Sequence, residues 1–206
     1  MKILCVMVPH FPWRCEVMRQ PALDGRPAIV TITSGSQKLV LDYSPELSGL
    51  LPDMPLQQAL ARYGEAGLLP ADMPYYRSVF TGMLDRLEGI SPLVEDAGPG
   101  CVYVGADGFQ LIYPDDRAIG DAVLGAIPDS FSPQIGLASN KFLAYLAALN
   151  CRPSSYRVIT GDVADYLKDI SVDVLPVSIK SREKLHTFGL LNYPLPGDRE
   201  ETRGKP

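Results

Sequence analysis

The stretch Met1–Val30 decides the fold and reads MKILCVMVPHFPWRCEVMRQPALDGRPAIV. Its apolar run at Lys2–Val8 is typical of a strand buried on both faces. An aromatic-rich turn and a helical stretch follow. The motif Pro-Ala-Leu-x-Gly-x-Pro then leads into a β-branched run at Ala28–Thr33, which predicts a second strand. We therefore expect a strand, a turn, a helix, a link and a strand in this order.

The elements beyond this stretch follow from hydrophobic periodicity and turn residues. We expect further strands at residues 37–43, 93–96, 101–104 and 133–138, and helices at 55–62, 73–87, 116–127 and 139–149. Ser139 is a candidate N-cap of the last helix. The first strand and the elements from residue 73 onward form a β-α-β-β-α-β series, the ferredoxin-like arrangement of an α+β fold, and the residues between them become an insertion.

The C-terminal part of the chain is less regular. A link at residues 152–155 precedes two short helices that we expect at 162–168 and 181–188. The tail at 196–206 is charged and has no apolar residue, so we expect it to be disordered.

Composition indicates a globular protein with an acidic balance. The chain has 206 residues, is 46% hydrophobic and has a formal net charge of −5, which suits one large domain or two small ones. Phosphate neutralisation supplies most non-specific affinity for DNA. An acidic chain should therefore bind DNA weakly by itself.

The cysteines and the apolar runs bear on the cellular compartment. Cys5, Cys15, Cys101 and Cys151 include no CxxC pair, so no zinc site is expected. No run has the pattern of a signal peptide or the length of a transmembrane helix. We expect a reduced, cytoplasmic protein that does not enter the membrane.

Six segments, in the correct order, resemble motifs of the Y-family (translesion) DNA polymerases. The most specific is Ile135–Ala147 (IGLASNKFLAYLA), which is similar to Gly-Ile-x-x-Asn-Lys-x-x-Ala-Lys-x-Ala. The other five are Met1–Val30, Tyr43–Pro55, Leu68–Tyr76, Ser91–Gly105 and Val174–Leu190. The resemblance implies a palm at residues 1–11 and 68–150, a fingers insertion at 12–67, a small helical thumb at 151–195 and no little-finger domain in this chain.

The chain departs from the family at the positions that carry the chemistry. The family's magnesium-binding carboxylates correspond here to Met7, Pro9, Gly100 and Cys101. Converging carboxylates hold the magnesium ions of phosphoryl transfer. The resemblance therefore implies no catalytic residue, no metal ion and no cofactor at this place.

The contacts of the family with the triphosphate and with DNA are also altered. Tyr43 remains, whereas Glu46 and Tyr145 replace cations, and an anion at position 46 would repel phosphate. Pro12 replaces the bulky residue that excludes ribose. The thumb hairpin glycines are replaced by Pro176–Ser178, where proline has no N–H to donate.

These combined losses resemble the ImuB-type accessory subunit of bacterial mutagenesis complexes. That resemblance implies a non-catalytic scaffold in DNA-damage tolerance, located in the cytoplasm at the nucleoid. It also implies three protein partners, namely a replicative-type polymerase, a RecA-like protein and the sliding clamp.

Two alternatives remain open. A weakly active nucleotidyltransferase could use a relocated metal site at Glu95, Asp96 or Asp107, although Glu95 and Asp96 should point to opposite faces of their strand. A primer-template binding module would instead contact DNA without chemistry. Its candidate contacts are Asn140, Lys141, Lys180, Arg182 and Lys184. Asn140 also suits a local cap, and the cations also suit a solvated helix face.

The segment His10–Trp13 (HFPW) has two interpretations. Phe11 and Trp13 are candidate contacts for a protein partner, or they pack the insertion onto the core, which we favour. Neither His10 nor His186 has a visible cysteine or carboxylate partner in the sequence.

Overall fold

The computed structural model describes residues 2–109, 111–168, 170, 171, 174, 184 and 187. The chain divides into two compact units, Met1–Val158 and Ile159–Pro206. In the second unit, the helix expected at 162–168 is present as α6 (Val163–Leu167), and Asp162 accepts a hydrogen bond from the Ala164 N–H at 2.9 Å. Most of the expected helix at 181–188, the positions Pro176–Ser178 and the tail lie outside the described residues. Among the helices of the described ranges, none is long and apolar enough to span a membrane.

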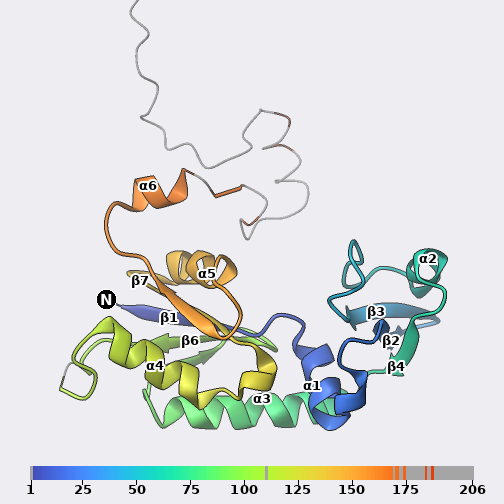
Figure 1. The fold of residues 1–206 in the computed structure, drawn as a ribbon, viewed down its shortest axis with the longest axis horizontal. Helices are drawn as coiled ribbons and strands as arrows, with labels where there is room; N and C mark the ends of the chain where they lie inside the picture. The colour runs from blue at the N-terminus through green and yellow to red at the C-terminus, as the bar shows by residue number, and fades with distance from the viewer. Residues whose placement is uncertain are drawn as a thin grey trace, which may run out of the picture. The chain divides into compact units, whose positions relative to one another are not determined.

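A five-stranded sheet forms the centre of the first unit (Figure 1). The strands are β1 (Ile3–Met7), β5 (Val94–Asp96), β6 (Cys101–Gly105), β7 (Gln134–Ala138) and β8 (Ser155–Val158), in the spatial order β5-β6-β1-β7-β8. Strand β1 pairs antiparallel with both β6 and β7.

Helices cover both faces of this sheet. Figure 1 shows α3 (Met73–Glu88) and α4 (Asp116–Ala126) on one face and α5 (Lys141–Leu149) on the other. Helix α5 lies so close to β7 that only glycine fits at position 136. A Cβ there would lie 2.0 Å from the Ala144 carbonyl oxygen. The series β1-α3-β5-β6-α4-β7 confirms the expected ferredoxin-like α+β core.

Strand β8 extends the palm sheet beyond its expected end at residue 150. The segment at 152–155 was expected to be a link, but Ser155–Val158 pairs in parallel with β7. The ring of Tyr156 packs against α4, where a Cβ at Gly120 would lie 3.0 Å from it. This strand forms because β7 and α4 offer it a partner and a packing surface, and neither is visible in its own sequence.

A three-stranded sheet and a short helix form the inserted region. Its strands are β2 (Ala28–Ser34), β3 (Gln37–Tyr43) and β4 (Gly67–Pro70), in the order β3-β2-β4, and its helix is α2 (Leu56–Arg62). The insertion has its own small core, which includes Ile29, Val40, Leu50 and Leu56. Strand β4 was expected to be a link after a boundary at residue 67. It pairs in parallel with β2, so this sheet runs to Pro70.

The segment His10–Trp13 begins a helix and is not a turn. Helix α1 (Phe11–Arg19) starts at Phe11. Pro12 fits in its first turn, because the backbone N–H groups of the first turn have no partner within the helix. Phe11 and Trp13 are 2% and 1% exposed. The ring of Phe11 lies 5.5 Å from that of Phe80 and 5.9 Å from that of Phe131. The two residues therefore pack in the core, which is the interpretation that we favoured, and almost none of their surface is left for a partner.

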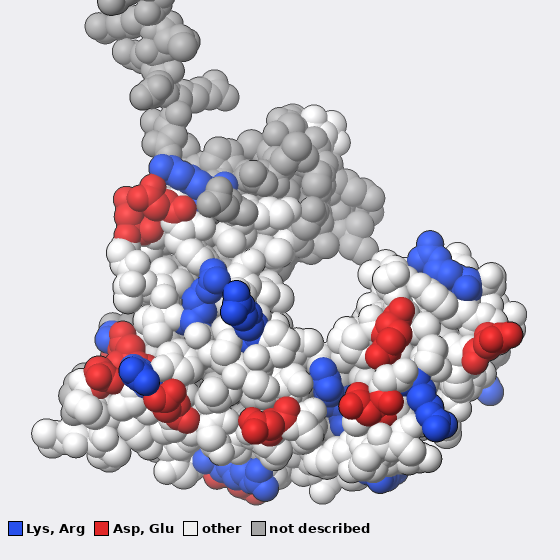
Figure 2. Space-filling view, in the orientation of Figure 1, with Lys and Arg blue, Asp and Glu red and all other residues white. Residues whose placement is uncertain are grey.

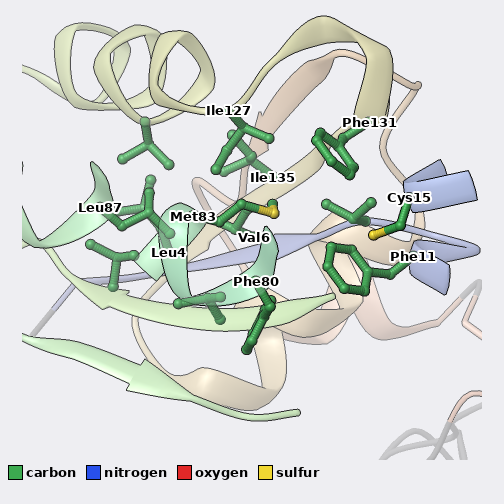
Figure 3. Close-up of a cluster of buried hydrophobic side chains, with 14 of the residues drawn as sticks. Leu4, Val6, Phe11, Cys15, Phe80, Met83, Leu87, Ile127, Phe131 and Ile135 are labelled. Carbon is green, nitrogen blue, oxygen red and sulfur yellow. The ribbon is translucent and has the colours of Figure 1, made fainter. Parts of the chain in front are cut away.

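Figure 3 shows the main core between the sheet and helices α3 and α4. Leu4 and Val6 from β1 face Met83 and Leu87 from α3, while Phe11 and Cys15 reach the same cluster from α1. The sequence pattern explains this face, because alternate residues of β1 point toward α3 and the residues between them point away. Ile3, Cys5 and Met7 point to the opposite face of the sheet, which α5 covers. Strand β1 therefore presents Cys5 and Met7 on the face opposite α3.

Candidate functional site

The structure brings together the four positions at which we expected the family's carboxylates to be replaced, where β1 ends and β6 begins. Met7 is paired with Cys101 across the two strands, and Pro9 follows two residues after Met7. The Val8 N–H donates to the Gly100 carbonyl at 2.8 Å and closes this junction. The side chains of Met7 and Cys101 offer sulfur atoms, and none of the four positions offers a carboxylate oxygen, whereas magnesium requires oxygen ligands.

The backbone at Gly100 leaves no space for a side chain. Its φ is +84°, in the left-handed region that favours glycine. A Cβ at this position would lie 2.7 Å from the Phe11 Cβ and 2.9 Å from the Val8 carbonyl oxygen. Any side chain at position 100, a carboxylate included, is therefore sterically blocked.

The candidates for a relocated metal site do not come together. Glu95 forms an ion pair with Lys141 at 2.5 Å, and Asp96 accepts from the Gly98 N–H at 2.7 Å. Asp107 accepts from the Lys2 N–H at 2.8 Å. In the described part of the chain, no group of three or more His, Cys, Asp or Glu side chains could hold a metal ion.

Cys5 and Cys101 form a close thiol pair at the same junction. Their Sγ atoms lie 3.9 Å apart, and Cys5 is fully buried whereas Cys101 is partly exposed. The hydrogen bond to Cys101, followed by burial, raises the pKa of the Cys5 thiol. The same hydrogen bond lowers the pKa of Cys101, because it stabilises the thiolate.

The predicted DNA-contact residues of α5 are engaged within the protein. Asn140 caps the helix by accepting from the Leu143 N–H at 2.9 Å, so the cap is Asn140 and not Ser139. Lys141 pairs with Glu95 and also lies over the Tyr103 ring, 5.5 Å from its centroid. Lys180 and Arg182 lie outside the described residues, and Lys184 is exposed.

The positions expected near a nucleotide lie on β3, after it, and on α5. Tyr43 is half-buried and its ring meets that of His10 edge-on, with the centroids 4.9 Å apart. Glu46 is exposed and Tyr145 is partly buried. Pro12 lines a cleft of about 440 Å³ with Leu41, Arg77 and Asp96, on the α3 side of the sheet.

His10 has a carboxylate partner that the sequence did not reveal. Its Nδ1 lies 2.7 Å from Oδ1 of Asp42, a residue of β3 that is only 5% exposed. Asp42 also accepts from the backbone N–H groups of Trp13 at 3.0 Å and Tyr43 at 2.9 Å. Asp42 thereby caps the first turn of α1 from the inserted sheet. The sequence gives one signal for a buried role of Asp42. It lies two residues after the apolar Val40 and therefore on the same face of the strand.

A second buried carboxylate, Glu16, joins α1 to α3. Its Oε1 accepts from Tyr76 Oη at 2.6 Å, and its two carboxylate oxygens, Oε1 and Oε2, accept from Arg19 Nη2 at 2.9 and 2.7 Å. Arg19 also donates to Asp72, the N-cap of α3, at 2.8 Å. Burial raises the pKa of the Tyr76 hydroxyl, and the hydrogen bond that it donates to Glu16 raises it further. Glu16 is thus a paired structural charge and no part of a metal site.

Charged side chains are mixed on the surface. On the face shown in Figure 2, acidic and basic groups form small separate clusters, and no continuous basic strip crosses the first unit. This arrangement agrees with the net charge of −5. This face therefore offers little of the phosphate-neutralising surface from which DNA-binding domains obtain affinity.

Comparisons with solved structures agree with this fold. The crystal structure of DinB from Sulfolobus solfataricus matches with a TM-score of 0.79 at 22% identity, covering 93% of this chain and 58% of that chain. The insertion ternary complex of Dbh DNA polymerase matches with a TM-score of 0.78 at 22% identity, covering 93% and 59%. The Y-family polymerase fold is therefore shown for this chain.

Comparisons with curated proteins point the same way. DNA polymerase IV of Picrophilus torridus is 24% identical over 84% of this chain and 52% of its own length. DNA polymerase IV of Saccharolobus solfataricus is 23% identical over 92% of this chain and 56% of its own length. The chain thus spans about half the length of the curated relatives it matches. The impB/mucB/samB family model matches residues 6–149, well over half of the sequence. The chain belongs to the impB/mucB/samB family.

Proposed function

We propose that this protein is a non-catalytic, Y-family polymerase-like subunit that serves as an interaction scaffold in DNA-damage tolerance. One observation carries the proposal. Met7, Gly100 and Cys101 meet at the junction of β1 and β6 without a carboxylate. Two-metal phosphoryl transfer needs carboxylates that converge on both ions, and this junction has none.

The surroundings of the junction support the same conclusion. Gly100 has no room for a side chain, and Glu95 is neutralised by Lys141. Glu46 places a negative charge where the family holds a cation for the triphosphate. These features weaken metal binding and phosphate binding together, as expected for a fold kept for a purpose other than catalysis.

The biological setting and the partners come from resemblance. Similarity to proteins named DNA polymerase IV favours a role in DNA-damage tolerance. The ImuB-type pattern favours a complex with a replicative-type polymerase, a RecA-like protein and the sliding clamp, in the cytoplasm at the nucleoid. The chain spans about half the length of the curated relatives it matches, so the activity and the partners of those whole proteins are proposals for this chain.

Direct measurement of metal-dependent nucleotide binding tests the loss of chemistry. Isothermal titration of the chain with a deoxynucleoside triphosphate and Mn²⁺ should give no metal-dependent heat, and primer extension should give no product. The equivalent segment of Sulfolobus solfataricus DinB is the matched control for length. Metal-dependent binding that disappears in Glu95→Gln or Asp96→Asn would overturn the proposal and make the protein an enzyme with a relocated site.

The scaffold role needs a separate test with purified partners. Analytical size exclusion of the chain with each of the three partner proteins from the same organism should yield at least one stable complex. A suitable control variant changes an exposed helical residue, such as Glu88→Ala in α3, whereas Leu41→Ala is unsuitable because Leu41 packs on the core. Absence of a complex with all three partners would refute scaffolding by this part of the protein.

A further inference from the structure

The thiol pair at the junction of β1 and β6 has a chemistry of its own. Cys5 and Cys101 are far apart in the sequence, yet their Sγ atoms lie 3.9 Å apart on the sheet face opposite α3. We propose that Cys101 is a peroxide-reactive thiol and that Cys5 converts its oxidation product into a disulfide between β1 and β6. The proposal does not depend on the function proposed above, because it concerns the modification of two residues of this chain.

Exposure and protonation assign different roles to the two thiols. The thiolate is the nucleophile in thiol oxidation. Cys101 is partly exposed, and its hydrogen bond with Cys5 lowers its pKa. Cys5 is fully buried, and the same contact together with burial raises its pKa. Cys101 is therefore the thiol that meets the oxidant first, because it is partly exposed whereas Cys5 is fully buried.

The chemistry is complete once hydrogen peroxide is supplied. The Cys101 thiolate attacks one peroxide oxygen, the O–O bond breaks, and the products are a sulfenic acid on Cys101 and, after protonation, water. The Cys5 sulfur then attacks the Cys101 sulfur, an S–S bond forms, and hydroxide leaves with the Cys5 proton as a second water. Overall, two thiols are oxidised to one disulfide and one peroxide is reduced to two waters.

The position of the pair on the strands predicts a disulfide that is easily reduced. Cys5 is opposite Tyr103, and Cys101 is opposite Met7, so the two cysteines are diagonal neighbours on the same face. Diagonal neighbours have Cα atoms about 7–8 Å apart, whereas disulfides prefer about 4.4–6.8 Å. The strands must shift to close the bond, and strained disulfides are the labile, regulatory ones.

The remaining cysteines are internal controls. Cys15 is fully buried, and burial, followed by the charge of Glu16, raises its pKa to about 12. Cys151 is 8% exposed and its Sγ lies 3.1 Å from Ser155 Oγ. Both should therefore react with peroxide more slowly than Cys101 in the folded protein.

The test is a time course of peroxide oxidation on the reduced full chain. Samples are quenched by alkylation and mapped by peptide mass spectrometry, with dimedone present in parallel to trap sulfenic acid. The expected product has lost two hydrogen atoms and links the Cys5 and Cys101 peptides. Cys101 should react about tenfold or more faster than Cys151, and dithiothreitol should restore both thiols.

Variants separate the two roles. Cys5→Ser should stop at a sulfenic acid on Cys101 that dimedone captures, Cys101→Ser should leave Cys5 reduced, and the control Cys151→Ser should still form the disulfide. The proposal is overturned if Cys101 reacts no faster than Cys151, or if Cys5 is oxidised equally well without Cys101. Should either variant fail to fold, the wild-type chain still decides, because its four thiols compete in one sample and urea-unfolded protein gives the reference rate.

Discussion

At the scale of single residues, Gly100 and Gly98 form a natural comparison. Both have positive φ, +84° and +112°, so an alanine would be strained at either position. A Cβ at Gly98 meets nothing within 4 Å, whereas a Cβ at Gly100 collides with Phe11 and with the Val8 carbonyl. The difference between the two variants therefore measures the steric closure of the junction, with the backbone strain largely cancelled.

We expect Gly98→Ala to lower the free energy of unfolding by about 1–2 kcal/mol and Gly100→Ala to lower it by a further 1–3 kcal/mol or so. Urea denaturation followed by circular dichroism gives both values. Equal losses for the two variants would mean that Phe11 and Val8 move aside without cost and that the junction is open to a side chain.

Cys15 gives a prediction about alkaline pH. Burial raises its pKa from 9.0 to about 12 in the folded chain. Between these values the folded state binds the thiol proton more tightly than the unfolded state does, so stability falls as pH rises through this window and is unaffected below it. Cys15→Ala should show a shallower decline of the free energy of unfolding from pH 9 to 12. Identical slopes for the two proteins would show that Cys15 is accessible to hydroxide.

At the scale of elements, the hydrogen bond from the Tyr76 hydroxyl to the Glu16 carboxylate links α3 to α1. Tyr76→Phe removes one donor from a buried carboxylate, while the hydrogen bonds from Arg19 remain. We expect a loss of about 1–3 kcal/mol in the free energy of unfolding. Tyr75→Phe is the matched control, because its hydroxyl makes only a long contact of 3.4 Å with the Cys15 carbonyl. Comparable losses would contradict the role assigned to Glu16.

The elements also show what the sequence can and cannot predict. Strongly periodic segments such as α3 and the order of the palm elements were predictable, and with them the meeting of Met7 and Cys101. Strands β4 and β8 were not, because each is four residues long and is stabilised by a neighbouring strand rather than by its own pattern. The pairs His10–Asp42 and Cys5–Cys101 depend on which residues meet across elements, and this register is not written in either partner alone.

At the scale of the whole molecule, charge sets the expected affinity for nucleic acid. The chain has a net charge of −5, and Lys141, a predicted contact, is already paired with Glu95. Fluorescence anisotropy with a primer-template duplex should give a dissociation constant weaker than the usual non-specific range of about 10⁻⁴–10⁻⁶ M at physiological salt. Glu95→Gln frees Lys141 and should strengthen binding slightly, with a steeper salt dependence. Tight binding by the unchanged protein would favour the primer-template module.

The closed junction at Gly100 also bears on how such a protein can evolve. A single mutation that introduces a carboxylate at position 100 would meet the Phe11 side chain and the Val8 carbonyl before it could hold a metal ion. Such a side chain would first require changes at Phe11 or Val8, which belong to the core, and changes there are destabilising by themselves. On the proposal of a non-catalytic subunit, packing as well as residue chemistry would keep a carboxylate out of position 100 in descendants of this chain, while surface positions would stay open to change.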